Sequence, residues 1–467
     1  MNDGIKIFLD AVGIFFIIYL IGYSTFLFLS VVSGSLELYK NYRQEKLKSI
    51  LPFDYTVPVT VIVPAYNEEI TVTDTVKSLL ELEYQAYEII VVDDGSEDGT
   101  SDSLINEFSM KKVNRPIRRR IACRMETAVY ESRAQKVPLT LIKKQNGGKA
   151  DALNMGINAS NFPYFICIDA DSILQYDSLR KVTEPILKDD SVVAVGGSVN
   201  ISNDIKMENA RVKKYKMPRS LLASMQVLEY DRSFLAARIL FDKFNGSLII
   251  SGAFGLFKKD MVIAAGGYDN KTVGEDMELV VKLHDYCTVN NIDYRIKYAN
   301  DAVCWTQVPE KLGDLCRQRR RWYIGLFQSM TGHKAMLMNS KFGAVSFISY
   351  MYFLVYELLS PFIEVFGVLT ILVAWATDLV NIRFMVLFFL IYAGFGVILS
   401  LTAFFSRAYT DELRISAPDA LKAVFLCLFE LTCLRFILAW VRATALFGSK
   451  SKKMKWGSIK RKKINIK

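Results

Sequence analysis

The chain has 467 residues, 51% of them hydrophobic and 23% charged, so it is long enough for two or three domains with a sizeable core. Its formal net charge is +10, but the basic residues gather in clusters and do not alternate with aromatic residues, so we expect no nucleic-acid binding. Only two His and seven scattered Cys are present, none in a Cys-x-x-Cys pair, which argues against a zinc site and a disulfide framework.

An apolar segment from Ile7 to Val32 lies near the start of the chain, and Asp10 is its only charged residue. At 1.5 Å per residue, about 26 residues reach about 39 Å, which is enough to cross the hydrocarbon core with some tilt. The segment is too long for a signal-peptide core, so residues 1–36 are predicted to form a retained transmembrane helix. Basic residues follow and place the next domain in the cytosol: Lys40, Arg43, Lys46 and Lys48.

Residues 50–340 alternate between strand-like and helix-like segments, which predicts an α/β domain with a largely parallel sheet and helices on both faces. The predicted strands are Val57–Val63, Glu88–Val92, Leu139–Lys143, Tyr164–Ile168 and Val192–Val195. The predicted helices are Ile70–Leu82, Ser220–Phe244 and Asp276–Asp285, with a strand or loop at Ser247–Phe257.

Two basic segments interrupt or end this pattern. Lys111–Lys136 is interpreted as an inserted basic helix or loop, either a solvated surface excursion or a patch that touches anionic lipid. Leu312–Met330 is amphipathic and basic, so we expect a helix at the membrane surface.

Residues 341–447 are predicted to form transmembrane and interfacial helices. Phe342–Leu379 is too long for one straight crossing and is divided by Pro361, Arg383–Phe405 is a clean span, and Ala420–Phe447 carries charged residues. The basic tail, residues 448–467, belongs in the cytosol, which requires an even number of crossings after the soluble domain. Either Pro361 separates two short spans or one stretch is interfacial.

Two motifs at predicted strand ends suit a nucleotide. The first, Pro64–Glu68, exposes the backbone at Ala65 and offers Tyr66 and Glu68 to a base and ribose. In the second, Asp93-Asp94-Gly95, the Asp94 carboxylate would accept a hydrogen bond from the imide N–H of uracil. The plainer alternatives are a strand–turn–helix for the first motif and a helix cap for the second.

Two further motifs suit a diphosphate and a metal ion. Gly147-Gly148-Lys149 is a loop that opens a helix, where backbone N–H groups and Lys149 would contact phosphate, although an ordinary glycine turn is equally consistent. Asp169-Ala170-Asp171 follows a buried strand, and its paired carboxylates suit Mg²⁺ or Mn²⁺ bridging phosphate oxygens. We also expect Asp169 to lie beside the nucleotide.

The last two motifs suit the acceptor. Gly274-Glu275-Asp276 opens a helix, and Asp276 is the candidate general base that deprotonates an attacking hydroxyl; a helix cap is the alternative. Gln318-x-x-Arg321-Trp322 offers Gln318 and Arg321 to the nucleotide diphosphate and Trp322 to a sugar ring. Three adjacent Arg residues are also compatible with a lipid-facing flank.

Taken in order, Asp94, Asp169/Asp171, Asp276 and Gln318/Arg321/Trp322 resemble the membrane-integrated processive synthases of glycosyltransferase family 2. The resemblance covers about residues 55–330. It implies a GT-A fold, a UDP-sugar donor, Mg²⁺ or Mn²⁺, inversion at the anomeric carbon, and export of the polymer through a channel made by the same chain. It also implies an acceptor-side loop at Ser251–Gly255, which includes Phe254, and acceptor contact by Glu275.

Two departures from the family pattern stand out. Residue 274 is Gly where cellulose synthases usually have Thr, and no cyclic-di-GMP-binding domain follows the membrane region, so control of that kind is not expected. The expected product is a β-glucan made from UDP-glucose, cellulose-like or of mixed linkage. The alternatives are a poly-N-acetylglucosamine or hyaluronan-like polymer, a non-processive transferase acting on a lipid carrier, or a catalytically silent scaffold.

The expected partners are a UDP-sugar, the growing polysaccharide and membrane lipids, and accessory subunits are left open. The expected location is the plasma membrane, with several crossings and the catalytic domain in the cytosol.

Overall fold

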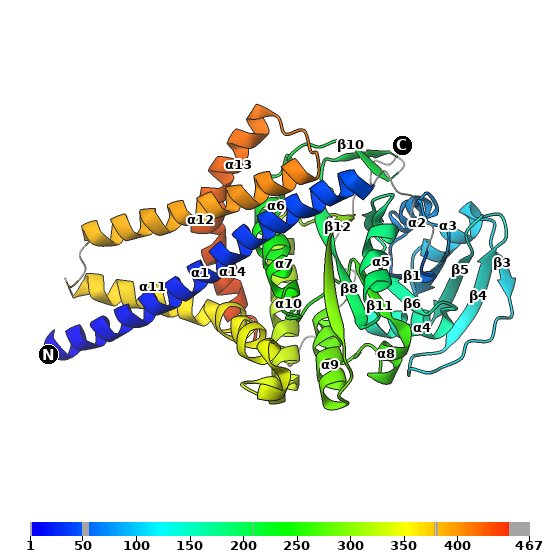
Figure 1. Cartoon of the computed structure of the whole chain (residues 1–467), viewed down its shortest axis with the longest axis horizontal. Helices are drawn as coiled ribbons and strands as arrows, with labels where there is room; N and C mark the ends of the chain where they lie inside the picture. Colours follow the sequence, from blue (N-terminus) through cyan, green and yellow to red (C-terminus); the bar gives the residue numbers. More distant parts are fainter. Residues whose placement is uncertain (1, 49–55, 209, 378, 380–381, 448–467) are drawn as a thin grey trace.

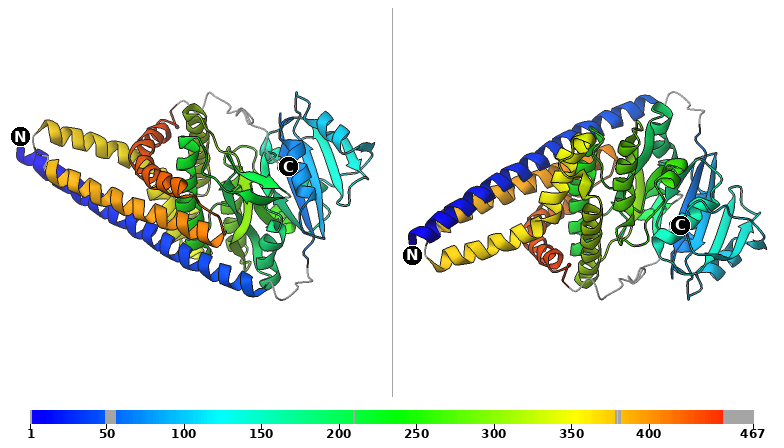
Figure 2. Two further views of the ribbon diagram at one scale, coloured as in Figure 1. Left: turned by 90° about the horizontal axis from the view of Figure 1, so that it is seen from above. Right: turned by 90° about the horizontal axis from the view of Figure 1, so that it is seen from below.

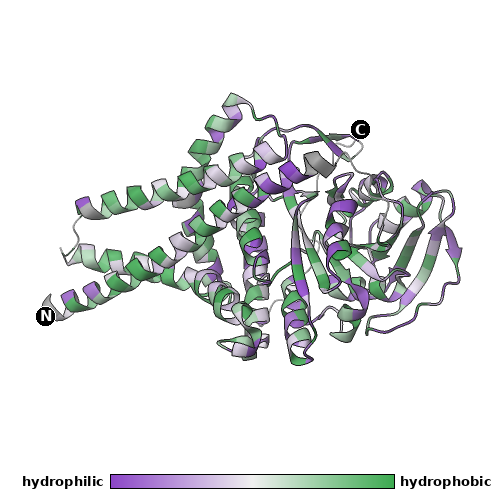
Figure 3. Cartoon of the chain, in the orientation of Figure 1, coloured by the Kyte–Doolittle hydropathy of each residue, from purple (hydrophilic) through white to green (hydrophobic). Residues whose placement is uncertain are grey.

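The computed structural model describes residues 2–48, 56–208, 210–377, 379 and 382–447. Figure 1 shows a sheet domain at one end and long helices that extend away from it at the other. These helices are α1 (Asn2–Lys48), α11 (Ser360–Ala376) and α12 (Ile382–Thr410). Figure 3 shows that apolar residues cover most of their length, as expected of segments that lie in lipid.

The sheet domain is built on ten strands in the order β3-β4-β5-β2-β1-β6-β11-β8-β12-β7. Its central strands β5, β2, β1 and β6 are all parallel, so their carboxyl ends meet at one edge. These four strands are β1 (Val59–Ala65), β2 (Tyr87–Asp93), β5 (Leu139–Lys144) and β6 (Tyr164–Cys167). The others are β3 (Lys111–Val113), β4 (Glu126–Ser132), β7 (Ser172–Leu174), β8 (Val192–Ile201), β11 (Gly255–Lys258) and β12 (Arg295–Thr306). A separate hairpin pairs β9 (Lys206–Glu208) with β10 (Arg211–Lys214).

Helices cover both faces of this sheet, because the central strands are apolar on both sides. In β1, Val61 and Val63 pack on one face and Ile62 on the other, as the two-residue repeat of a strand requires. The first face is covered by α2 (Val72–Leu80), α3 (Thr100–Glu107) and α5 (Ser178–Lys188). The second face is covered by α4 (Lys149–Ala159), α8 (Lys259–Ala264) and α9 (Glu275–Val289). The predicted α/β class, with helices on both faces, is confirmed.

The segment Lys111–Lys136 differs from its prediction. It is neither a helix nor a plain loop, since β3 and β4 form an antiparallel pair that extends the edge of the sheet. Several of its Arg side chains pair with acids of the same domain, as in Arg115 with Glu131 at 3.2 Å. Figures 1 and 2 place these strands at the end of the molecule opposite the long apolar helices, and therefore away from the lipid around them.

A layer of helices separates the sheet from the apolar helices (Figure 1). It contains α6 (Leu221–Glu229), the π-helical turn η1 (Tyr230–Ala236) and α7 (Ala237–Asp242), which together confirm the predicted helix Ser220–Phe244. It also contains α10 (Leu312–Gly332), which confirms the predicted helix Leu312–Met330. Short 3₁₀ turns at Lys334–Met336 and Ser340–Phe342 follow α10.

Among the described residues, three helical segments suit a membrane span by length and composition: Lys6–Gln44, Met385–Thr410 and Ala417–Ala443. A fourth is a bent pair, Val345–Leu358 and Ser360–Ala376, whose parts meet at 46°. The break lies beside Pro361, as predicted, because Pro at the start of a helix cannot continue the preceding one. The π-helical turns Val345–Tyr350 and Phe353–Leu358 make up the first part of this pair.

The last helical stretch runs α13 (Ala417–Phe429), π-helical turn Glu430–Leu434 and α14 (Arg435–Ala443). In Figures 1 and 2 it lies across α1, α11 and α12, beside the helical layer. Two ion pairs join η1 to the helices beside it. Arg232 of η1 contacts Glu430 of the last helical stretch at 2.7 Å, and Asp231 of η1 contacts Arg407 of α12 at 2.7 Å. The predicted basic tail, residues 448–467, lies outside the described residues.

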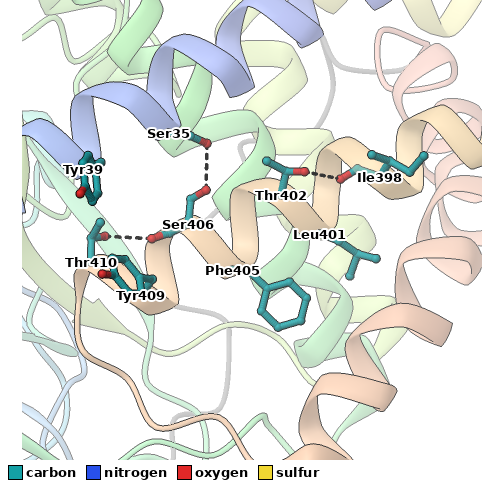
Figure 4. A pocket seen from close by; sticks show the side chains of 9 residues that line it. All are labelled: Ser35, Tyr39, Ile398, Leu401, Thr402, Phe405, Ser406, Tyr409 and Thr410. Carbon is teal, nitrogen blue, oxygen red and sulfur yellow. Dashed lines mark hydrogen bonds between the residues drawn. The ribbon is translucent and has the colours of Figure 1, made fainter.

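A groove of about 570 Å³ lies between two of the apolar helices, α1 and α12 (Figure 4). Its walls are mostly apolar, and the hydroxyls of Ser35 and Ser406 hydrogen-bond across it at 2.9 Å. Small hydroxyl residues allow helices in lipid to approach closely, so this contact fastens α1 to α12.

Candidate active site

The loops after β1 and β2 form one continuous edge of the sheet. The backbone N–H of Asp94 donates to the carbonyl of Ala65 at 2.9 Å, and the N–H of Asn67 donates to the Ser96 hydroxyl at 3.0 Å. Glu68 is half-buried and accepts from the Thr71 hydroxyl at 2.7 Å. Tyr66 is half-buried in the same loop. The two predicted nucleotide motifs are therefore neighbours in space, as expected of adjacent parallel strands.

Asp94 itself points inward. Its carboxylate accepts from the N–H of Gly147 at 3.0 Å and the N–H of Gly148 at 2.7 Å, and it forms an ion pair with Lys144. The Asp94 and Lys144 side chains have no exposed surface, and burial raises the pKa of Asp94 although Lys144 opposes the rise. In this structure the Asp94 carboxylate holds the glycine turn, and a contact with uracil requires it to leave this network.

That glycine turn aims Lys149 into the site. Gly148 has φ +93°, a left-handed conformation that only glycine adopts without strain, and α4 begins at the next residue. The Lys149 ammonium lies 2.5 Å from Asp169 and 3.4 Å from Glu275. Burial alone would lower the pKa of Lys149, but the charges of Asp169, Glu275 and Asp276 outweigh burial and raise it. Lys149 therefore stays a cation at the centre of an acidic cluster.

Asp169 and Asp171 follow β6 directly. Asp169 is partly exposed, with 32% of its side chain accessible, while Asp171 is buried. Both lie close to the Cys304 thiol, whose pKa is raised by burial first and then by the charges of both carboxylates. Among the described residues, no group of three or more His, Cys, Asp or Glu side chains is arranged to hold a metal. A hard divalent ion shared with substrate phosphates needs only one or two protein carboxylates, so this pair fits such an ion.

Asp276 lies at the first turn of α9, where the helix dipole stabilises a negative charge. Its carboxylate accepts from the N–H of Gly252 at 3.2 Å and from the N–H of Met277 at 2.9 Å. Burial raises the pKa of the neighbouring Glu275, an effect that Lys149 opposes and Asp276 reinforces. The structure therefore brings Lys149, Asp169, Glu275 and Asp276 to one place.

The loop at Ser251–Gly255 reaches this place through its backbone. Gly252 faces both Lys149 and Asp276, since a Cβ there would lie 3.1 Å from the Lys149 ammonium and 3.5 Å from the Asp276 carboxylate. The Phe254 ring points the other way, is fully buried and packs against Gly197 in the core. A direct contact between the Phe254 ring and an acceptor is therefore not available in this structure.

Helix α10 supplies the remaining predicted residues. The side-chain oxygen of Gln318 is buried without a hydrogen-bond partner among the described residues, as expected of an atom whose partner is a ligand. The charge of Arg321 opposes the rise in the pKa of Glu275, so the Arg321 guanidinium lies near the acidic cluster. Trp322 is half-buried, with the Phe234 ring edge-on at 6.1 Å and the Arg319 guanidinium 4.5 Å above its face.

A contact between two glycines fixes the distance from α10 to the start of α9. A Cβ on Gly274 would lie 2.7 Å from the Cα of Gly325, and a Cβ on Gly325 would lie 2.7 Å from the Cα of Gly274. The side-chain oxygen of Gln328 accepts from the Thr272 hydroxyl and the Val273 N–H, both at 3.0 Å. Gly at position 274, where the sequence departs from the cellulose synthases, is thus required by the close approach of α10.

The comparisons with known proteins agree with this geometry. The profile described as Glycosyl transferase family 2 matches residues 60–123, and the profile described as Glycosyltransferase like family 2 matches residues 123–325. Together they span residues 60–325, more than half of the chain and almost the whole sheet domain. The chain belongs to glycosyltransferase family 2.

Named relatives in this family refine the comparison. A poly-beta-1,6-N-acetyl-D-glucosamine synthase of Staphylococcus aureus (strain COL) is 30% identical over 326 residues, which are 69% of this chain and 66% of that protein. The enzyme of the same name from Staphylococcus epidermidis is 33% identical over 282 residues, which are 60% of this chain and 56% of that protein. The match thus spans less than two thirds of the length of each relative, 66% of the first and 56% of the second.

These relatives contradict the expected β-glucan product made from UDP-glucose, because they are named for a polymer of N-acetylglucosamine. They agree with the alternative that the sequence left open. The error has a physical cause. The motifs predicted to bind the nucleotide, metal and diphosphate include no residue assigned to the 2-substituent of the sugar, so the prediction could not distinguish a hydroxyl from an acetamide.

One solved structure supports the fold. The mannosyltransferase PcManGT from Pyrobaculum calidifontis, in complex with GDP-Man and Mn²⁺, aligns with a TM-score of 0.51 at 19% identity. The alignment covers 84% of this chain and 99% of that one. The predicted GT-A fold with flanking membrane helices is confirmed.

Sequence reasoning missed several residues of this site. Lys144 pairs with Asp94 and also contacts Asp151 at 2.6 Å, and both of these side chains are buried. A charged residue ending an apolar strand was the available signal for Lys144. For Gly325 the signal was weaker, because a single glycine three residues after Trp322 identifies no partner until α9 is placed beside it.

Proposed function

We propose that this family 2 glycosyltransferase is a processive synthase that polymerises N-acetylglucosamine from UDP-N-acetylglucosamine through β-1,6 linkages. The observation that carries the proposal is the convergence of Lys149, Asp169, Glu275 and Asp276 beside α10, at the carboxyl edge of the sheet. The S. aureus synthase, which is 30% identical over 69% of this chain, supports the choice of sugar and linkage.

The donor would lie along the edge formed by the β1, β2 and β5 loops. Tyr66 and Glu68 would contact the nucleoside, with the backbone of Ala65 beneath it, and Asp94 would act through the glycine turn that it holds. Lys149, Arg321 and Gln318 would face the diphosphate. Lys149 and Arg321 are preorganised cations in a partly buried site, so they would compensate the charge of the diphosphate more effectively than cations in water.

Asp169 and Asp171 would hold Mg²⁺ or Mn²⁺, which when bound neutralises charge on the departing diphosphate. The carboxylates fit this role because one is partly exposed towards Lys149 and the other lies behind it in the same loop.

Asp276 would be the general base. Its carboxylate takes the proton of the acceptor 6-hydroxyl while that oxygen attacks the anomeric carbon, and the bond from this carbon to the diphosphate oxygen breaks. The attack comes from the face opposite the leaving group, so an α-linked donor gives a β-linked product and UDP. Two backbone N–H groups keep the Asp276 carboxylate fixed for this step.

The membrane helices give this reaction a direction. The basic residues after the first helix favour a cytosolic sheet domain, and α11 and α12 run out and back as a pair (Figure 1). In this proposal α11 and α12 cross the membrane and α13 and α14 lie at its interface, so that the number of crossings after the sheet domain is even. Trp322 would hold the acceptor end of the polymer at the inner end of these helices, in the plasma membrane.

Donor profiling tests the proposal. The purified full chain is incubated with UDP-N-acetylglucosamine, UDP-glucose or UDP-glucuronate, with and without Mg²⁺ or Mn²⁺. We expect polymer only from UDP-N-acetylglucosamine with metal, degraded by a β-1,6-specific poly-N-acetylglucosamine hydrolase. Polymer that resists this hydrolase, or full activity in excess chelator, would overturn the assignment. The Asp276→Asn variant controls for contaminating transferases.

A further inference from the structure

Glu229 is the last residue of α6, and its carboxylate faces α10. Its two oxygens accept from the two terminal nitrogens of Arg319, each at 2.8 Å. The Arg319 side chain is 8% exposed and that of Glu229 17%, so the pair is largely desolvated. A bidentate carboxylate–guanidinium pair fixes the plane of the guanidinium as well as its position.

That plane matters because of what lies against it. Arg319 and Trp322 are three residues apart on α10, which makes them neighbours on the helix surface. The Arg319 guanidinium lies 4.5 Å from the centre of the Trp322 ring, within the range of a cation–π contact. Phe234 of η1 meets the same indole edge-on, at 6.1 Å and 65°.

We propose that Glu229 is a positioning residue: through Arg319 it sets the orientation of Trp322, and with it the grip of the enzyme on the growing polymer. This rests on the proposed function, in which Trp322 stacks on the acceptor sugar. Stacking on a sugar depends on the plane of the aromatic ring, so a ring free to rotate would bind the acceptor more weakly. Neither Glu229 nor Arg319 contacts Lys149, Asp169 or Glu275, so donor binding is separate.

The proposal predicts that the KM for the acceptor changes while the KM for the donor does not. Glu229→Gln loses the bidentate pair and frees the plane of the Arg319 guanidinium, so the KM for an added β-1,6-linked N-acetylglucosamine oligomer rises by about three- to thirtyfold, with complete loss of a desolvated cation–π contact as the upper bound. The KM for the UDP-sugar stays unchanged and the polymer becomes shorter. If the Glu229→Gln protein does not fold, Arg319→Lys decides the question, because it keeps the charge and loses the planar fork.

A charge swap distinguishes positioning from a simple tie between helices. The double variant Glu229→Arg with Arg319→Glu keeps an ion pair between α6 and α10 but removes the cation from Trp322. We expect its thermal midpoint to recover and its acceptor KM to stay high. Recovery of the acceptor KM in the swap, or an unchanged acceptor KM in Glu229→Gln, would overturn the proposal.

Two controls complete the experiment. Asp314→Asn removes an exposed ion pair with Arg317 on the same helix and should leave both KM values and polymer length unchanged. If the wild-type chain makes no polymer from UDP-N-acetylglucosamine, the proposed function fails. If the wild type makes polymer and Glu229→Gln makes it identically, the positioning role alone fails.

Discussion

The proposed donor half and the proposed acceptor half of this site are built by different means. The donor half consists of the loops after β1, β2, β5 and β6, and its centre is an ionic network of Lys144, Asp94 and Asp151 buried within one domain. The acceptor half consists of α6, α9 and α10, joined by the Gly274–Gly325 crossing and the Glu229–Arg319 pair. Strand ends bring the donor residues together automatically, whereas the acceptor residues meet only if helices distant in sequence pack at the right spacing.

The largest expected effect falls on chemistry in the acceptor half. Asp276→Asn should lower transfer by about two to four decades, the contribution of a general base, while UDP still binds the donor half with unchanged affinity. Transfer rates and UDP binding by calorimetry measure the two halves separately. Asp260→Asn, at an exposed acid, is the matched control and should be silent. Near-normal transfer by Asp276→Asn would reject the role.

Next in size is the stability of the donor half. Lys144→Met leaves two buried carboxylates without their cation and should cost about 3–5 kcal/mol of unfolding free energy. Denaturant unfolding in detergent measures the loss. Lys77→Met breaks an exposed pair with Glu107 and should cost less than about 1 kcal/mol. Equal losses of unfolding free energy in the two variants would show that the buried network contributes no more to stability than an exposed ion pair.

The packing of the acceptor half predicts a smaller, purely kinetic effect. Gly325→Ala forces the α10 backbone away from Gly274, and a displacement of about 1 Å can lower turnover by up to a hundredfold. We expect a ten- to hundredfold fall in kcat. Gly332→Ala places a methyl group in open space on the same helix and should have no effect. A wild-type kcat in Gly325→Ala would show that the crossing is adjustable.

The smallest expected effect is a pH dependence in the acceptor half. His284 of α9 is fully buried, with its ring nitrogens 2.7 Å from the Tyr294 hydroxyl and 2.9 Å from the Ser247 carbonyl. Burial lowers its pKa from 6.5 to about 4. Between these values the unfolded state binds more protons, so stability falls as the pH falls, by at most about 1.4 kcal/mol per pH unit.

Unfolding of the wild type and of His284→Asn between pH 4 and 6.5 measures this slope. The variant should lose the part of the slope that comes from His284. Identical slopes in the two proteins would contradict the assignment of a buried neutral imidazole.

The comparison of halves also explains what the sequence could reveal. Asp169 and Asp276 were recognisable because a strand end or helix start next to an acid is a local pattern, and the parallel strands followed from β-branched runs. Phe254 was misleading, since its loop does reach the site but its ring turns into the core. Lys111–Lys136 was misread because its Arg residues hid a strand alternation, and their charges are neutralised by acids such as Glu131 that only the fold brings near.

The partner of a side chain was the least predictable quantity. Asp94 lies where its motif predicts, but its carboxylate is turned inward by Lys144, which comes from a strand fifty residues later. Glu229 has no motif at all, and its link to Trp322 exists only because α6 and α10 lie side by side.

The Gly274–Gly325 contact has a consequence for how such enzymes diverge. With two backbones in contact, a side chain at either position requires α10 to move out, which would change the separation between the base and the Arg321–Trp322 face. Substitution of residue 274 or residue 325 alone is therefore expected to give a poorly active enzyme. We therefore expect residues 274 and 325 to drift as a pair, so that the identity of residue 274 reports how far apart the two helices lie in a relative.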